Sequence, residues 1–236
     1  MLKERRRVKG LLLAVLLLPG VVMADAGQAD PLEGYNRAMF SFNDKADRWV
    51  LKPVAKGYRY VTPDFFERGV SRMFSNLGEV LNVVNDLLQG KVGQAGNDGG
   101  RLLINSTIGL AGFFDVAKHA GLEKSAGEDF GQTFGAWGVG EGAYVVLPFW
   151  GPSTLRDAPS LLLDSVFNPI GEVDHVPTRN QLYGANVVSV RADLLEAEKL
   201  IKGDRYAFIR DVYLQRRQFL VNDGEVEDDF GDDDYN

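Results

Sequence analysis

Apolar residues recur at helical spacing along much of the chain. The clearest run lies between residues 77 and 88, where they follow the i, i+3, i+4, i+7 pattern of one helix face. Its members are Leu77, Val80, Leu81, Val84, Leu87 and Leu88, and the opposite face carries Asn82, Asn85, Asp86 and Gln89. Gly90 is a typical helix stop. The pattern predicts an amphipathic helix whose apolar face either packs in a helical core or lies in a lipid interface.

Cap signals predict two helix starts near the beginning of this helical region. Asp30-Pro31-Leu32-Glu33 combines an N-cap, a proline at the first helical position and a capping-box glutamate. The helix that follows is expected to end near Leu51, because a residue before proline disfavours helical geometry and Pro53 is next but one. Thr62-Pro63-Asp64 predicts a second start.

Further helices are predicted towards the C-terminus. One is expected from Asp98 to Asn105, and another opens at the capping box formed by Thr178 and Gln181. The second should carry an apolar face that ends at Gly203 and consists of Val190, Leu194, Ala197 and Ile201. Asp204 is expected to cap the last helix, whose predicted face is Tyr206, Ile209, Tyr213 and Phe219 or Leu220.

Residues 128–157 interrupt the helical pattern with six glycines and six aromatic residues. Each glycine costs a helix about 1 kcal/mol relative to alanine. Six glycines in one segment therefore indicate that it is not an ordinary helix. Gly131, Gly135, Gly138 and Gly142 either form one stripe of a helix or belong to a mobile loop. Only 143–147 resembles a strand, and it is isolated. The predicted class is all-α with one long glycine-aromatic insertion.

The inventory of reactive residues argues against covalent chemistry. The chain contains no cysteine and two histidines, which excludes a disulfide framework and leaves few parts for zinc or Ser-His-Asp sites. His119 is best explained as a cation near a helix C-terminus. His175, next to Asp174, could act as a base, but no nucleophile accompanies it. Gly138 to Ala143 fits a loose dinucleotide pattern in the wrong context, before a strand. No metal and no cofactor is predicted.

The N-terminus resembles an export signal. A basic segment precedes nine apolar residues from Gly10 to Leu18, and Val22-Met23-Ala24 fits the small-x-small cleavage rule. We expect residues 1–24 to be a cleaved signal peptide. No later segment reaches 18 consecutive apolar residues, so no transmembrane helix is expected in the mature chain. Because no cysteine follows the apolar run, acylation is not expected and the mature chain should carry no lipid anchor.

The charge distribution excludes a nucleic-acid function. The sequence has 26 Lys and Arg against 33 Asp and Glu, and the predicted signal holds five of the basic residues. Residues 223–236 add eight acidic residues without a basic one, which indicates a solvated, disordered tail. Nothing in this distribution could neutralise a row of phosphates.

Several motifs in order resemble the MlaA/VacJ family of bacterial outer-membrane lipid-asymmetry proteins. They span 30–224 and include Asp30 to Arg37, Phe42-Asn43, Ser75 to Leu77, Val84 to Gly90, Arg101 to Gly109, Asp129 to Thr133, Trp137 to Gly140, Leu147-Pro148 through Asp157, Arg179 to Leu182 and Tyr206 to Leu220. The resemblance implies a single ring-like helical domain, here 25–222, in the inner leaflet of the outer membrane. Such a protein associates with trimeric porins and removes mislocalised phospholipids from the outer leaflet through an amphipathic channel. A periplasmic carrier of the Mla pathway then receives the lipid.

The resemblance also suggests which residues serve the lipid. We expect the path to be lined by Phe134, Trp137, Val139, Tyr144 and Val146, with Phe42 and Asn43 positioning the insertion. Gly131, Gly135, Gly138, Gly140 and Gly142 are expected to act as hinges or to allow close approach. Two other functions stay open: a porin-associated scaffold that carries no lipid, and a phospholipid hydrolase that uses Asp174 and His175. The family is typically acylated, so without cysteine attachment should rest on interfacial burial and on partners.

Overall fold

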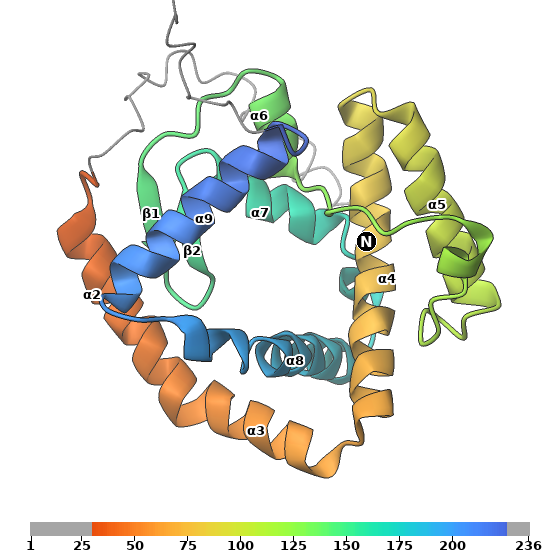
Figure 1. Ribbon diagram of the computed structural model, residues 1–236, viewed down its shortest axis with the longest axis horizontal. Helices are drawn as coiled ribbons and strands as arrows, with labels where there is room; N and C mark the ends of the chain where they lie inside the picture. The colour runs from red at the N-terminus through yellow and green to blue at the C-terminus, as the bar shows by residue number, and fades with distance from the viewer. Residues whose placement is uncertain (1–29, 226–236) are drawn as a thin grey trace, which may run out of the picture.

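The structure, a computed structural model, describes residues 30–225, and most of them are helical (Figure 1). The predicted signal peptide and residues 226–236 of the acidic tail lie outside the described residues. The helices are α2 (Glu33–Ala46), α3 (Lys52–Val61), α4 (Asp64–Leu88), α5 (Val92–Thr107), α6 (Phe130–Ala136), α7 (Asp157–Val166), α8 (Val176–Asp193) and α9 (Arg205–Val221). A hairpin of β1 (Tyr144–Leu147) and β2 (Gly151–Thr154) completes the domain, together with short 3-10 turns at Ala117–Ala120, Pro169–Glu172 and Ala197–Leu200.

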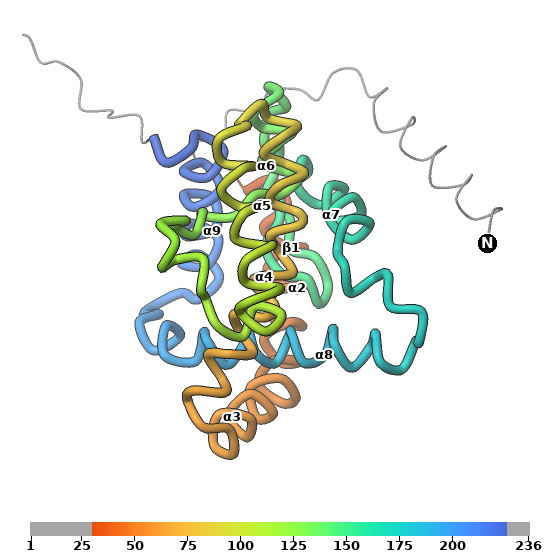
Figure 2. Tube along the Cα trace, turned by 90° about the vertical axis from the view of Figure 1, so that its right-hand side faces the viewer, coloured from red at the N-terminus to blue at the C-terminus, as the bar shows by residue number. Residues whose placement is uncertain are grey.

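These elements are arranged as a ring (Figure 1). The helices α2, α3 and α4 form three sides, and α6, α7, α9 and the hairpin form the fourth. The helix α8 packs on both α3 and α4 and runs across them (Figure 2). The helix α5 packs on the outside of α4. The all-α class and the ring-like arrangement are therefore both confirmed.

The first helix does not end before Pro53, as the sequence suggested. The chain stays helical from α2 through a π-helical turn, Asp47–Leu51, directly into α3. Proline lacks an N–H and its ring clashes with the carbonyl oxygen four residues earlier. A π-helical turn is wider and bonds i to i+5, which accommodates Pro53 without breaking the helix.

The predicted positions of the helix starts agree with the structure better than the predicted capping interactions do. Asp204 caps α9 as predicted, accepting hydrogen bonds from the backbone N–H of Tyr206 at 3.0 Å and of Ala207 at 3.4 Å. Two capping boxes are wrong. The Glu33 carboxylate forms an ion pair with Arg37 at 2.7 Å instead of accepting a hydrogen bond from the backbone at the start of the helix. The N-cap of α8 is His175, whose Nδ1 accepts from the backbone N–H of Thr178 at 3.4 Å.

The strand-like segment is not isolated. β1 pairs with β2 in an antiparallel hairpin in which Tyr144 faces Thr154 and Leu147 faces Gly151. Pro152 cannot donate to a ladder, which is tolerated in a strand whose other edge is free. β2 was not predicted, because Gly151 and Pro152 both disfavour strands.

At the end of α4 the apolar residues are not the buried ones, although a core-facing orientation was one of the two possibilities. Leu87 and Leu88 are exposed, whereas Asn85 and Asp86 are completely buried. The predicted face after Thr178 is wrong as well. The helix α8 ends at Asp193, and Val190 and Leu194 are each about half exposed while Ser189 and Ala192 are buried. At these positions polar or small residues are buried between helices, while large apolar residues stay exposed.

Candidate functional site

Two asparagines of α2 fix the hairpin to the ring. The fully buried Asn36 donates to the carbonyl oxygen of Tyr144 at 3.0 Å and accepts from the N–H of Val146 at 2.8 Å. Two turns later, Asn43 donates to the carbonyl oxygen of Leu147 at 2.9 Å and accepts from the N–H of Phe149 at 2.8 Å. Each side chain thus replaces a strand partner along β1. Both side chains therefore connect α2 to the hairpin of the glycine-aromatic insertion.

The hairpin packs on an aromatic cluster. Tyr144, Val146 and Tyr206 are buried together, with Met39, Phe40, Tyr213 and Leu214 around them. The phenol of Tyr206 donates to Asp30, and burial together with this carboxylate raises the pKa of Tyr206. Two of the residues expected to line a lipid path, Tyr144 and Val146, therefore lie in the protein core in this conformation.

An ion-pair network lies beneath α6. Arg217 of α9 donates to Asp157 at 2.8 Å and to both oxygens of Asp129 at 2.5 and 2.9 Å. Burial alone would raise the pKa of Asp129, but the hydrogen bonds and charge of Arg217 hold it below its usual range. Gly131 makes this contact possible, because a Cβ there would lie 2.5 Å from Asp157 Oδ1 and 2.6 Å from an Arg217 nitrogen.

The glycines of the insertion therefore differ in what they do. Gly135 also allows close approach, since a Cβ would lie 2.7 Å from Val221. Gly138 and Gly142 have φ values of 86° and 71°, a left-handed geometry that glycine adopts without strain. Gly140 lies in the irregular stretch between α6 and β1. Neither a single helical stripe nor one uniform loop describes the set.

Three other predicted path residues gather at the end of α6. The Phe134 and Trp137 rings lie 6.0 Å apart. Trp137 is 52% exposed, and its indole N–H donates to the carbonyl oxygen of Leu88 at 3.2 Å. Val139 is exposed next to them. Phe42, by contrast, packs on the exposed Phe149 at the hairpin tip, with ring centroids 5.1 Å apart. The structure divides the predicted path among three places, and the path stays a prediction.

Many large apolar side chains are exposed to solvent. Large exposed side chains occur on every side of the ring, among them Trp49, Tyr60, Leu103, Ile108, Trp150, Leu162 and Leu200. Four phenylalanines, Phe65, Phe66, Phe113 and Phe114, stack edge to face between the start of α4 and the loop after α5, with neighbouring centroids 5.1–6.0 Å apart. Phe113 and Phe114 were not predicted as functional residues. Their signal was two adjacent aromatics directly after Gly112.

The interior contacts between α4, α5 and α6 are polar. Arg101 reaches Glu79 at 3.4 Å and Asp115 at 3.1 Å, and Thr133 donates to Asn85 at 2.7 Å. Burial, reinforced by the nearby Asp98 and Glu128, raises the pKa of Asp86 from 3.8 to about 7. The paired groups fix how the helices pack, because burying them without partners would be costly. Both carboxylate oxygens of Asp86, by contrast, are buried without a hydrogen-bond partner, which agrees with the raised pKa.

The described residues offer no arrangement for metal chemistry. Within 30–225 no group of three or more His, Cys, Asp or Glu side chains is placed to hold a metal ion. No helix in that range has the length and hydropathy to cross a membrane. His175 accepts a backbone hydrogen bond at the start of α8 and lies 2.8 Å from the hydroxyl of Thr178.

Comparisons with known proteins show which family the chain resembles. The family model for the MlaA lipoprotein matches residues 28–220. The chain is 36% identical to the intermembrane phospholipid transport system lipoprotein MlaA of Escherichia coli K12 over 93% of this chain and 90% of that protein. It is 35% identical to the protein of the same name in Shigella flexneri and 34% identical to that in Haemophilus influenzae. A solved structure described as the structural basis for maintenance of bacterial outer membrane lipid asymmetry matches with a TM-score of 0.73 and 34% identity. It covers 83% of this chain and 100% of that one.

Proposed function

The chain belongs to the MlaA lipoprotein family, and on that premise we propose that it is a non-enzymatic phospholipid conduit at the periplasmic side of the outer membrane. In this proposal the protein takes mislocalised phospholipids from the outer leaflet and delivers them to a soluble periplasmic carrier. Association with a trimeric porin is part of the same proposal. Support comes from the relatives' role in phospholipid transport and from the chemistry of this chain's surface.

The observation that carries the proposal is the inverted distribution of polar and apolar side chains. Buried positions are mostly polar or charged, such as Glu79, Asn85, Asp86 and Asp98, while large apolar side chains stay exposed around the ring. Fully burying one such side chain stabilises a protein by about 1.5–3 kcal/mol. A chain that leaves many of them exposed has surface suited to acyl chains rather than to water.

The same surface supports attachment to the membrane. The chain has no cysteine, whereas its curated relatives are named lipoproteins. Trp49, Tyr60 and the four-phenylalanine cluster supply large apolar groups on the outside of the ring. A single 14-carbon acyl anchor gives a protein only marginal binding to a membrane. Several aromatic side chains buried in the interface contribute on a similar scale. We propose that burial of these side chains in one leaflet holds the protein.

Passage of lipid should use the insertion between α6 and β2. Phe134, Trp137 and Val139 offer apolar surface beside glycines whose backbone can approach acyl chains closely. The hairpin is held at both ends by Asn36 and Asn43, so its position is fixed relative to α2. These contacts favour a path next to the hairpin, with the Trp137 side chain as its best placed member.

Mass spectrometry of bound lipid tests the proposal. The protein, purified in mild detergent, is incubated with phospholipid vesicles, re-isolated and analysed for lipid. Intact bound phospholipid supports the conduit. Lyso-phospholipid products would replace it with hydrolysis, and no bound lipid on a folded sample would leave the porin-associated scaffold as the better account.

A further inference from the structure

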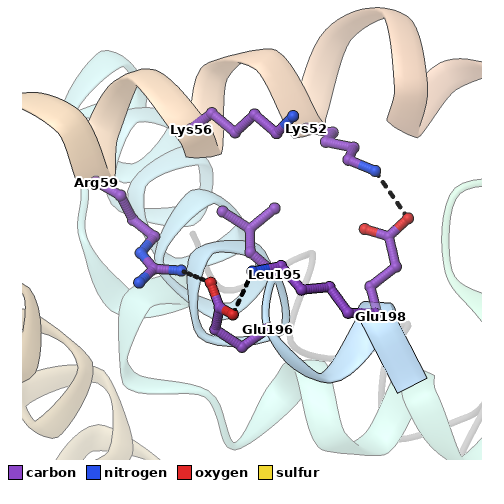
Figure 3. Close-up of a pocket in the computed structure, with 7 residues that line it drawn as sticks. Lys52, Lys56, Arg59, Leu195, Glu196 and Glu198 are labelled. Carbon is purple, nitrogen blue, oxygen red and sulfur yellow. Dashed lines mark hydrogen bonds and ion pairs between the residues drawn. The ribbon is translucent and has the colours of Figure 1, made fainter. Parts of the chain in front are cut away.

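A basic groove lies between α3 and the 3-10 turn Ala197–Leu200, away from the hairpin (Figure 3). Its volume is about 580 Å³. Four cations line it, namely Lys52, Lys56, Arg59 and Lys199, against two carboxylates, Glu196 and Glu198. The lining therefore carries an excess of positive charge.

Both carboxylates of the groove are already bound by cations. Glu198 accepts from Lys52 at 2.9 Å, Arg191 at 2.6 Å and Arg205 at 3.0 Å. Burial alone would raise the pKa of Glu198, but these three hydrogen bonds lower it to about 2, so the carboxylate stays ionised. Glu196 is shared by Arg59 at 3.3 Å and Lys199 at 2.5 Å. Neither carboxylate is available to neutralise a further cation.

Lys56 is the groove cation that takes no part in these ion pairs. Within residues 30–225 no carboxylate lies within ion-pairing distance of its ammonium group, and its side chain is exposed. Figure 3 shows it extending along the groove between Lys52 and Arg59, without a dashed line to any neighbour. An ammonium group has three donors, and the ammonium groups of Lys52 and Lys199 also keep donors in reserve.

Exposed aromatic residues flank these cations on the same side of the helix. Tyr60 follows Lys56 by one turn and is 91% exposed, while Trp49 precedes Lys56 by about two turns and is 82% exposed. The other side carries a second exposed apolar face, formed by Val50, Val54 and Val61. A helix with one apolar face, aromatic residues and flanking lysines lies in a membrane interface, with its lysines at the level of the lipid phosphates.

We propose that this groove, the α3 basic groove, binds the phosphate headgroup of an anionic phospholipid. Lys56 and Lys199 donate to the phosphate, and the acyl chains lie against Trp49 and Tyr60. The proposal rests on the proposed function only for its assumption that α3 meets the membrane. It assigns a second lipid contact, distinct from any path beside the hairpin, that would recruit or orient the protein on anionic lipid.

Trp49 provides a direct reporter of this site. In the full chain with Trp137→Phe and Trp150→Phe, Trp49 is the single tryptophan. Two sets of phosphatidylcholine vesicles are compared, one containing dibrominated phosphatidylglycerol and the other the same mole fraction of dibrominated phosphatidylcholine. Bromine quenches the fluorescence of Trp49 in proportion to the amount of brominated lipid next to it. We expect clearly stronger quenching by the brominated phosphatidylglycerol. Lys56→Gln should weaken binding to vesicles that contain phosphatidylglycerol about fivefold, since a lysine near an anionic surface contributes about 1 kcal/mol.

Lys124→Gln is the matched control, because Lys124 is an exposed lysine outside the groove. It should leave the headgroup preference unchanged, while Lys56→Gln combined with Lys199→Gln should abolish it. Equal quenching by both brominated lipids, or an equal effect of Lys124→Gln, would overturn the groove while leaving membrane contact intact. Loss of the preference in inorganic phosphate at constant ionic strength would also overturn it in favour of a free-phosphate site. No quenching by either lipid would instead contradict the membrane position assumed in the proposed function.

Discussion

Asn36 of α2 serves as a strand partner for Val146 of β1, accepting from its backbone N–H at 2.8 Å. The same side chain donates to the carbonyl oxygen of Tyr144, and it is completely buried. A helix side chain thereby satisfies the free edge of a two-stranded hairpin. This contact joins two segments more than 100 residues apart and closes the ring on that side.

Asn36→Ala should destabilise the protein by about 2–4 kcal/mol, because it leaves a buried backbone donor and a buried acceptor unpaired. The measurement is urea unfolding in mild detergent, followed by circular dichroism. Asn180→Ala, at an exposed position of α8, is the matched control and should change the free energy of unfolding by less than about 0.5 kcal/mol. Equal stability of the two variants would show that the hairpin does not depend on Asn36.

Gly131→Ala should destabilise the protein by about 1–3 kcal/mol, because the new methyl group overlaps the contact between Asp157 and Arg217. Gly96→Ala in α5 is the matched control, since a Cβ there meets nothing within 4 Å. Alanine favours a helix over glycine, so this variant should gain up to about 1 kcal/mol. The same unfolding measurement distinguishes them, and stabilisation by both substitutions would contradict the close-approach role of Gly131.

The pH dependence of stability should reflect the buried Asp86. Its pKa of about 7 in the folded protein lies above its ordinary value of 3.8. Between these values the folded state keeps a proton that the unfolded state releases, so the free energy of unfolding falls as pH rises through this range. Burial also raises the pKa of Asp164 to about 7, which adds to the same slope.

Asp86→Asn removes the Asp86 contribution to this slope. The variant should match the unsubstituted protein near pH 4 and be more stable than it at pH 8, where the unsubstituted protein carries the buried charge. Thermal unfolding at pH 5, 6, 7 and 8 measures the difference. Asp174→Asn, at an exposed position, should keep the original slope. A slope in Asp86→Asn as steep as in the unsubstituted protein would contradict the raised pKa.

Most helix starts could be predicted from the sequence, whereas the buried face of a helix could not. In α4 the alternation of Leu87 and Leu88 with Asn85 and Asp86 was read correctly as two faces. Periodicity alone cannot assign the inner one, because the external medium of a lipid-associated protein is as apolar as a core. Pro53 was misjudged because a π-helical turn rescues the helix, and that depends on backbone geometry that no single residue encodes.

Trp137→Asp should block phospholipid passage while leaving the helices folded. Trp137 is half exposed at the end of α6, so a carboxylate there is solvated by water but repels an apolar chain. The measurement is the phospholipid exposed in the outer leaflet of cells that produce only this variant, with circular dichroism as the check on folding. Trp137→Phe keeps an apolar ring and should retain function. Normal outer-leaflet composition with Trp137→Asp would remove Trp137 from the lipid path.

Photocrosslinking with intact phospholipids that carry a diazirine on the acyl chain tests the conduit most directly. Both a conduit and a membrane-bound scaffold should crosslink on outward-facing segments such as α3, where Trp49 and Tyr60 are exposed next to each end of the helix. Only a conduit should also crosslink within residues 131–149 of the glycine-aromatic insertion, and Trp137→Asp should suppress those crosslinks selectively. Crosslinks confined to the outer helices, with none in the insertion, would contradict the conduit.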